Sequence, residues 1–494
     1  MGRTVSYVQD VLGHNILTTD AAGVMTHKTY DGMGRIVQED LEASDSSSTI
    51  TTRTTAYDLA GRVVQETDAN GKDTFYVYCK VGPSGDAYDA QSDAYFYEET
   101  RVYPHRNSDT TWTAPPVQVT WTDSHGNVVR SWTGSSAGTW NASSPPTGGD
   151  ALTELSRTTY AYDWAGRQIE QRDYHNLASL TKADAGTAGT NFYTNTTEYD
   201  LLGRVYQQID TQGNIAQNEY DAKGRVVKVY AGVDEQSLVQ VGEVYYDTNR
   251  DGTGDDRSYV TRRRFLKSGV SALTDFATDS TYIDYEEDYD TTNDLKVEWS
   301  KPAAGSGPWS RQSSDYMGRA LFNETYENGS TTTLLSHVEN VYDDAGSHPF
   351  RKIGSRIYEV VSGSATANFL QTTYAYEDDT ERQVKVTGPS GAFTKVTFDV
   401  FGRTARQVAA TAEGATDDAT SFTDDTVVTE VVYGYDDAGN VIWTETYDRT
   451  HDATATGLLS TANDNQRRPR YTATWYDDAN RPTHTADYGD QPPQ

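Results

Sequence analysis

Oxygen-bearing side chains stand at every second position of one acidic loop. Within the stretch YDTNRDGTGDDRS they match positions 1, 3, 5, 7 and 9 of an EF-hand loop, and they are Asp247, Asn249, Asp251, Thr253 and Asp255. Gly252 falls at position 6, where a loop of this kind turns sharply. Ca²⁺ takes several oxygen ligands at about 2.3–2.6 Å from a flexible loop. The spacing therefore predicts a calcium site.

The calcium loop departs from the full pattern at its end. Position 12 is Ser258 instead of the glutamate that supplies a bidentate ligand. Asp256 or a carboxylate from elsewhere in the chain could replace that ligand. The alternative interpretation is a solvated, acid-rich hairpin tip in a protein that has many Asp turns.

A second acidic cluster, YIDYEEDYD at residues 282–290, has the alternation of a β-strand. One face of this strand carries Asp284, Glu286, Asp288 and Asp290, and the other face is apolar and aromatic. The pattern favours a hydrated face over a metal site. A row of like charges would also discourage further strand pairing at a sheet edge.

Enzyme motifs are scarce in the sequence. Its nine His and one Cys have no zinc-ligand spacing, and neither Gly-x-Ser-x-Gly nor a phosphate-cradling glycine loop occurs. Pairs of carboxylates are too numerous to indicate glycoside hydrolysis. The sequence therefore predicts a protein that is not an enzyme.

Charge excludes several kinds of partner. The formal net charge is −32, and an acidic surface is repelled by nucleic-acid phosphates and by anionic membranes.

No stretch approaches the ~18 apolar residues of a transmembrane segment. Cys79 is the single cysteine, so an internal disulfide is impossible.

A short pattern, Tyr-Asp-x-x-Gly-Arg, recurs through the chain. The elements that it forms must position the calcium loop and the acidic strand. The pattern occurs five times, with a sixth copy in which Phe replaces Tyr. The residues of the six copies are Tyr30, Asp31, Gly34, Arg35, Tyr57, Asp58, Gly61, Arg62, Tyr162, Asp163, Gly166, Arg167, Tyr199, Asp200, Gly203, Arg204, Tyr220, Asp221, Gly224, Arg225, Phe398, Asp399, Gly402 and Arg403. Weaker copies begin at Asp123, Asp315, Asp343, Asp436 and Asp477.

The repeat reads as the tip of a β-hairpin. In the copy that begins at Asp477 the glycine has become Asn480, and Asn is the non-glycine residue that best tolerates a left-handed backbone. The glycine position therefore requires positive φ, as in a type I turn closed by a bulge. Asp at the first turn position can accept hydrogen bonds from the amides that follow it.

Second glycine turns, such as DAAG at residues 20–23 and DTQG at residues 210–213, lie about ten residues from the first ones. One unit is then strand, turn, strand, turn, and it spans about 21 residues from Tyr199 to Tyr220. No long stretch has helical periodicity. The fold class predicted is all-β, a long antiparallel sheet of consecutive hairpins with very little helix, over residues 1–494.

The repeated tyrosines and arginines have a structural interpretation. An isolated hairpin is marginally stable, so each unit must pack on its neighbours. We expect the tyrosines to pack between strands. We expect each arginine either to stack on a neighbouring Tyr or to pair with a turn Asp, instead of binding anions or doing catalysis.

These motifs resemble the YD or RHS repeats of bacterial Rhs proteins, of the C components of insecticidal toxin complexes and of teneurins. The resemblance implies a spiralling antiparallel sheet that forms a shell, tube or fibre, secreted or at the bacterial cell surface. In toxin-bearing relatives the shell encloses a toxic segment and ends in an Asp-Pro-x-Gly-Leu-type motif, which is absent here. Insertions interrupt the repeats at about 74–121, 131–160, 253–313 and 330–374.

The resemblance favours a non-enzymatic structural module of a large protein. Met1-Gly2-Arg3 has the form of a repeat tail, which indicates a fragment whose partners are flanking repeats or identical subunits. One alternative is the wall of a toxin-encapsulating shell, with an enclosed toxin segment. Another is an adhesin that binds surface glycans through exposed aromatic side chains, for which the candidates are Trp112, Trp121, Trp132 and Trp140.

Overall fold

The computed structural model describes residues 5–492 apart from 92, 94, 105–115, 136–143, 251–254, 258, 267–275, 277–279, 345–347, 378–379, 412–420 and 477–479. Met1-Gly2-Arg3 and Ser258 therefore lie outside the described residues. So do Asp477 and the glycine of the copy that begins at Asp343.

The described strands form one 32-stranded sheet, and each strand pairs antiparallel with the strand that precedes it in the sequence. The first half consists of β1 (Ser6–Gln9), β2 (Asn15–Thr19), β3 (Met25–Tyr30), β4 (Ile36–Glu42), β5 (Thr49–Tyr57), β6 (Val63–Asp68), β7 (Asp73–Val81), β8 (Tyr97–Pro104), β9 (Val117–Thr122), β10 (Val128–Ser135), β11 (Thr153–Tyr162), β12 (Gln168–Tyr174), β13 (Phe192–Tyr199), β14 (Val205–Ile209), β15 (Ile215–Tyr220) and β16 (Val226–Gly232). The second half consists of β17 (Val239–Tyr245), β18 (Arg262–Leu266), β19 (Ser280–Asp290), β20 (Leu295–Pro302), β21 (Trp309–Ser314), β22 (Ala320–Tyr326), β23 (Leu334–Tyr342), β24 (Lys352–Val361), β25 (Ser364–Tyr376), β26 (Gln383–Thr387), β27 (Phe393–Phe398), β28 (Thr404–Ala410), β29 (Val427–Tyr435), β30 (Val441–Arg449), β31 (Arg467–Tyr476) and β32 (Pro482–Gly489). Short 3₁₀ turns lie at Glu235–Ser237, Leu459–Thr461 and Asp464–Gln466.

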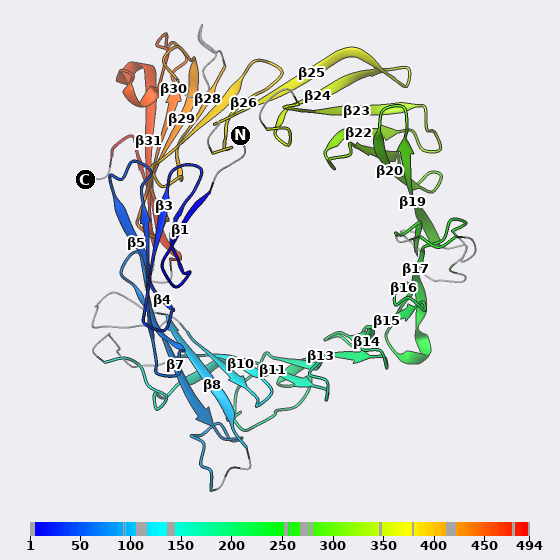
Figure 1. Ribbon diagram of the computed structural model, residues 1–494. Helices are drawn as coiled ribbons and strands as arrows, with labels where there is room; N and C mark the ends of the chain where they lie inside the picture. Colours follow the sequence, from blue (N-terminus) through cyan, green and yellow to red (C-terminus); the bar gives the residue numbers. More distant parts are fainter. Residues whose placement is uncertain are drawn as a thin grey trace.

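This architecture confirms the predicted fold class. The strip of strands bends round into a ring, so that the first strands (blue) lie beside the last strands (orange to red) in Figure 1. Adjacent β-strands are rotated relative to one another because each strand twists, and a long meander accumulates that rotation. Regions set apart in the sequence as insertions contain regular members of the sheet, including β7–β9, β18–β21 and β23–β25. Their extra length lies in long connections and in long strands such as β25, which has 13 residues.

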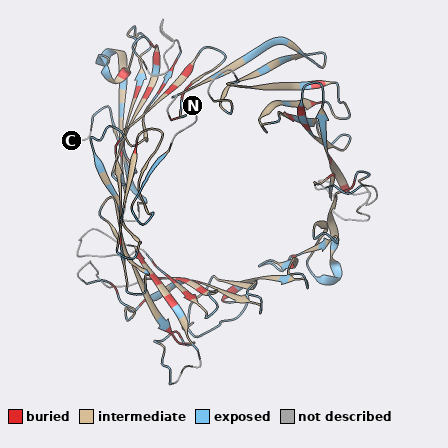
Figure 2. Cartoon of the chain, in the orientation of Figure 1, coloured by how far each residue is buried: buried red, intermediate tan, exposed pale blue. Residues whose placement is uncertain are grey.

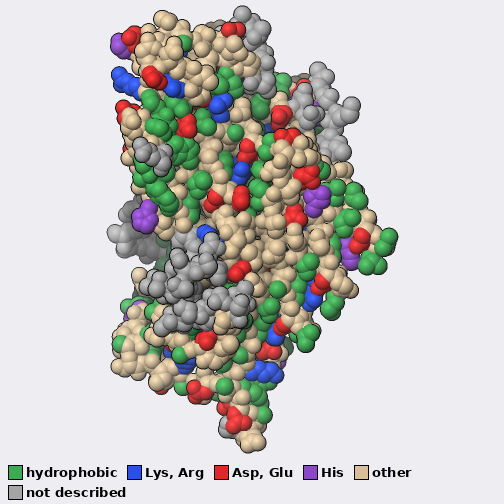
Figure 3. Space-filling view, turned by 90° about the vertical axis from the view of Figure 1, so that its left-hand side faces the viewer, with side chains coloured by type: hydrophobic (Ala, Val, Ile, Leu, Met, Phe, Trp, Pro, Cys, Tyr) green, Lys and Arg blue, Asp and Glu red, His purple; other side chains and the backbone are tan. Residues whose placement is uncertain are grey.

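The ring closes where its two ends overlap. Asn70 Nδ2 donates to Asp436 Oδ2 at 3.1 Å across 366 residues of sequence, and Asn480 Nδ2 donates to Asp68 Oδ2 at 3.3 Å across 412 residues. We call this contact the seam, and it joins turns 20–24, 43–48 and 68–72 to turns 377–382, 399–403, 436–440 and Asn480. The side of the ring in Figure 3 carries acidic and basic side chains interspersed.

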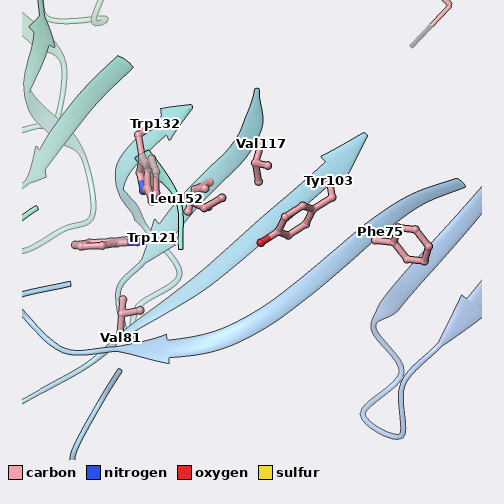
Figure 4. Close-up of a cluster of buried hydrophobic side chains, with 8 residues drawn as sticks. Phe75, Val81, Tyr103, Val117, Trp121, Trp132 and Leu152 are labelled. Carbon is pink, nitrogen blue, oxygen red and sulfur yellow. The ribbon is translucent and has the colours of Figure 1, made fainter. Parts of the chain in front are cut away.

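Burial is concentrated in two patches where long connections cover the sheet (Figure 2). The larger patch is formed by Phe75, Val81, Tyr103, Val117, Val119, Trp121, Trp132 and Leu152, from β7–β10 and the connection that follows β10. Trp121, Trp132 and Leu152 lie close together in Figure 4. The smaller patch is formed by Val408, Val427, Tyr447 and Leu459. The rest of the sheet is mostly half-buried, as in a wall one layer thick.

Among the described residues, no helix is long and apolar enough to cross a bilayer.

Candidate functional site

The repeated turn is the most regular side-chain arrangement in the protein. At the copy that begins at Asp31, the Gly34 amide donates to the Asp31 carbonyl at 3.0 Å, and the Asp31 amide donates to the Arg35 carbonyl at 2.9 Å. Gly34 has a φ of +79°, so the turn is type I closed by a left-handed residue, as the sequence predicts. Asp31 Oδ1 accepts hydrogen bonds from the Met33 and Arg35 amides at 2.9 and 3.0 Å.

The left-handed position is kept along the chain. The glycines of the other four full copies and of the copy with Phe have φ values between +75° and +86°, and they are Gly61, Gly166, Gly203, Gly224 and Gly402. Asn480 has a φ of +57°, so the left-handed backbone is kept where asparagine replaces the glycine.

Each arginine of the repeat bridges two units. Arg35 Nε and Nη2 donate to Asp31 Oδ2 at 2.7 and 2.6 Å, within the same turn. The flat face of the same guanidinium lies 4.4 Å from the ring centroid of Tyr57, in the next unit. The Tyr57 hydroxyl donates to the carbonyl of Ile36, the residue directly after Arg35, at 2.8 Å. We call this set of contacts the YD clamp.

The clamp recurs with nearly constant geometry. In the further copies the Arg Nε to Asp Oδ2 distance is 2.6–2.8 Å, and the guanidinium carbon lies 4.0–4.9 Å from the next aromatic ring. The ring pairs are Arg62 with Tyr78, Arg167 with Tyr199, Arg204 with Tyr220, Arg225 with Tyr246, Arg319 with Tyr342, and Arg403 with Tyr435. The sequence presented stacking and Asp pairing as alternatives, and the structure contains both.

One copy of the clamp does not match the Tyr-Asp-x-x-Gly-Arg pattern and was not predicted from the sequence. In the turn that begins at Asp10, His14 takes the place of arginine. Its Nδ1 lies 2.9 Å from Asp10 Oδ2, and its ring stacks on Tyr30 with centroids 4.7 Å apart. The sequence signal for this copy is Asp10 followed three residues later by Gly13. In the structure Gly13 has a positive φ, as in the other turns.

The turn carboxylates are held in their ionised form. Backbone hydrogen bonds from the arginine amide, joined by the guanidinium and a second amide, lower the pKa of the carboxyl below its ordinary value of 3.8. This holds for Asp31, Asp58, Asp163 and Asp200. The aspartate is therefore ionised in the folded turn at neutral pH.

Of the predicted calcium ligands, Asp251 and Thr253 lie outside the described residues. Asp247 is buried at the base of the hairpin, and its carbonyl accepts from Thr261 Oγ1 at 2.7 Å. The Thr248 amide donates to the Asp255 carbonyl at 2.9 Å and the Asp255 amide to Thr248 Oγ1 at 3.0 Å.

Among the described residues near the calcium loop, the substitute ligand suggested by the sequence is already paired. The Asp256 carboxylate pairs with Lys223 and Arg225, so it is engaged elsewhere and is a poor replacement ligand. Within the described part of the chain, no group of three or more His, Cys, Asp or Glu side chains could hold a metal. Asn249 lies in this loop between Asp247 and Arg250. The calcium site therefore stays a prediction.

The acidic strand is only partly the hydrated face that its sequence suggested, because Asp288 is exposed but the first two carboxylates of the row are paired. Asp284 is buried and pairs with Arg262 Nε at 2.6 Å. Glu286 pairs with Arg250 Nη2 at 2.6 Å and also with Lys301. Strand β18 pairs with β19 up to Asp284, and β20 pairs with it up to Asp290, so Asp284 does not lie at a sheet edge. The cations come from other elements, and no local pattern in the sequence indicates them.

The buried patches contain charged groups that the sequence did not single out. Glu99 is buried and accepts from Trp121 Nε1 and from Arg101 Nε, both at 2.6 Å. Lys395 and Asp425 form a buried pair at 2.8 Å, in which Asp425 belongs to the connection after β28. A buried charge is tolerated only when it is paired. The Lys395–Asp425 pair therefore fastens a connection to the sheet, and the Glu99 contacts join β8 to β9.

Two of the four tryptophans proposed for glycan stacking lie within the described residues. Trp121 and Trp132 are buried in the larger patch, where sugars cannot reach them. Trp112 and Trp140 lie outside the described residues.

A groove of about 810 Å³ lies on the sheet between β19 and β23. Its lining includes small side chains, among them Ser300 and Ser310. Glu287 and Glu298 are cross-strand neighbours in it, and Lys296 Nζ lies 3.6 and 2.6 Å from their carboxylates. The lysine partly neutralises this carboxylate pair.

Neither a family model nor a curated protein matches the chain. Among solved structures, the chain is similar to a crystal structure of TcdB2-TccC3 without its hypervariable C-terminal region, at 15% identity and a TM-score of 0.36, over 99% of this chain and 26% of that one. It is also similar to a Photorhabdus luminescens Tc holotoxin pore, at 14% identity and a TM-score of 0.37, with coverage of 99% and 26%. The chain spans about a quarter of the length of these proteins, and similarity at this level assigns no role to its residues.

Proposed function

We propose that this chain is a structural, non-enzymatic wall segment of a large bacterial protein that is secreted or exposed at the cell surface. The observation that carries the proposal is the YD clamp. The residues that recur most regularly, Tyr, Asp, Gly and Arg, are engaged in contacts within a turn or between consecutive turns. A repeat used in this way builds a continuous surface, and it leaves no recurring group for chemistry.

Enclosure of a cargo, such as a toxic segment, is the second candidate function. The ring formed by the sheet favours it, because a strip that bends back on itself surrounds its contents (Figure 1). The glycan-binding alternative is weakened by the burial of Trp121 and Trp132.

Small-angle X-ray scattering of the whole chain in dilute solution tests the wall proposal. A ring gives a pair-distance distribution shifted to long vectors, with a larger radius of gyration than a compact domain of the same length. A radius of gyration near ~23 Å, the value for a compact domain of this size, would reject it.

A calcium site at Asp247, Asn249, Asp251, Thr253 and Asp255 remains a secondary proposal, supported by ligand spacing alone. Calorimetric titration with Ca²⁺ before and after Asp251→Ala tests it. Heat from the unaltered chain that disappears in the variant is expected, and no heat from the unaltered chain rejects the site.

A further inference from the structure

The two long rims of the strip are chemically different. In a meander, successive turns alternate between the rims, so every turn that joins an odd-numbered strand to the next even-numbered strand lies on the same rim. All the YD turns are of this kind, including those at residues 31–35, 200–204 and 399–403. We call this side the YD rim, and the side with turns such as 20–24 and 68–72 the opposite rim.

The seam shows how one winding of the strip meets another. The Ser44 amide, on the opposite rim, donates to the Val400 carbonyl in a YD turn at 3.2 Å. Asp436 and Asn480 also come from YD turns, and both bond to the opposite rim at turn 68–72. The seam therefore joins the YD rim of the last strands to the opposite rim of the first strands.

Apolar side chains are covered at this contact. Val24 is buried on the opposite rim, and it lines a cavity of about 300 Å³ together with Val384 and Val400 of the last strands. Phe401, which follows Val400 in the same turn, is half-buried. Val400, at the first of the two central positions of this YD turn, thus lies against the neighbouring winding.

The same two central positions are exposed in other turns of the YD rim. In six turns they carry large hydrophobic side chains that are 74–106% exposed. These are Val11, Leu12, Met33, Leu59, Trp164, Leu201, Leu202 and Tyr316. Single exposed apolar residues are ordinary, but their recurrence at these two turn positions on one rim is typical of an interaction surface.

We propose that the bare YD rim docks onto the opposite rim of a second copy of this chain, and so continues the seam between molecules. This inference deepens the proposed wall function, on which it rests. The contact pairs two different surfaces, so it is heterologous, and repetition gives open head-to-tail stacks instead of closed dimers. The opposite rim also carries exposed apolar side chains, at Val233 and Val361.

The formal charge of −32 on each copy opposes stacking at low ionic strength. Salt screens that repulsion and leaves apolar contacts intact. Association should therefore strengthen between about 50 and 500 mM NaCl, a range in which the Debye length falls by about threefold.

Sedimentation velocity of the whole chain over a range of concentrations tests the proposal, with three variants that keep the net charge. The YD-rim variant is Leu59→Ser, Leu201→Ser and Leu202→Ser. The opposite-rim variant is Val233→Ser and Val361→Ser. The control variant removes three exposed aliphatic side chains from the sheet face, by Ile357→Ser, Leu370→Ser and Ile442→Ser.

The unaltered chain and the control variant should associate alike. Both rim variants should associate at least about tenfold more weakly, since each contact needs one surface of each kind. Circular dichroism melting confirms that the variants are folded.

The proposal is overturned if the unaltered chain is monomeric at every concentration and salt level. It is also overturned if the opposite-rim variant associates as strongly as the unaltered chain, which would indicate that the YD rim docks onto another YD rim. Normal association of both rim variants overturns it too, and would indicate strand pairing through β1 or β32. X-ray scattering from the monomeric fraction distinguishes failure of the stacking proposal from failure of the wall proposal. A ring-shaped monomer supports the wall proposal even when the chain does not associate.

Discussion

At the scale of single residues, the fold depends on a side chain that makes two different contacts at once. The edge of the Arg204 guanidinium donates to Asp200, while its face lies 4.3 Å from the ring centroid of Tyr220. Edge and face are separate surfaces, so neither contact excludes the other. The sequence predicted each contact separately. It could not predict their combination, because the aromatic ring arrives from the next hairpin.

Replacing Gly203 by alanine should destabilise the protein by about 1–2 kcal/mol, because a Cβ is unfavourable in the left-handed conformation. Gly203 has a φ of +82°, and an added Cβ would lie 2.8 Å from Arg167 Nη1. Urea unfolding measures the change. Gly32→Ala is the matched control, since Gly32 lies in the same kind of turn, its φ is not positive, and no atom lies within 4 Å of an added Cβ. Equal losses in the two variants would contradict the left-handed requirement.

Removing the clamp arginine should cost about 1 kcal/mol, the sum of a partly exposed ion pair and a cation–π contact. Arg204→Ala tests this by the shift of the unfolding midpoint. Arg468→Ala, at an exposed arginine of β31, should leave the midpoint nearly unchanged. If Arg204→Lys matched the unaltered chain, charge alone would suffice and the planar clamp would be unnecessary.

At the scale of elements, the strands follow from the local sequence but the connections do not. Repeated Asp-x-x-Gly turns determine where strands end, and they correctly predict the succession of hairpins. The pairing of Lys395 with Asp425 links strand β27 to a connection 30 residues away, and nothing local indicates it. The same holds for the cations that neutralise Asp284 and Glu286. Such contacts are set by where a long connection folds back.

Breaking the buried pair should be more costly than breaking a clamp. Asp425→Ala leaves the Lys395 ammonium buried without its carboxylate, and we expect a loss of about 3–5 kcal/mol. The double variant Lys395→Met with Asp425→Leu should recover most of that loss, because it removes both buried charges. Thermal unfolding of the three proteins measures it. A single variant as stable as the unaltered chain would show that the connection does not need this contact.

At the scale of the whole molecule, the single sheet was predictable and its closure was not. The repeat implies one continuous meander, but the curvature is the sum of many small rotations between neighbouring strands. The seam between Asn70 and Asp436 follows only from that sum. No feature of the sequence marks residues 366 positions apart as partners.

Acid should destabilise the whole ring cooperatively. The turn carboxylates have a pKa below 3.8 in the folded chain. Their contribution to the stability of the fold is fully present well above the pKa of the unfolded chain, and it is lost as the pH falls through the pKa of the folded chain. The melting temperature should therefore vary little from about pH 7 to pH 5 and fall steeply below about pH 4. Asp31→Asn with Asp200→Asn should flatten that fall. A melting temperature that rises toward pH 3 would contradict the role of the charged turns.

Closure of the ring is the central claim, and a distance across the seam tests it most directly. Spin labels at Ser47→Cys and Ala438→Cys, both exposed positions beside the seam, are introduced in a Cys79→Ser background. Pulsed electron paramagnetic resonance on dilute protein should give one narrow, short distance, although the two labels are almost a whole winding apart along the chain. A broad distribution at long distances would show an open strip and would contradict the ring.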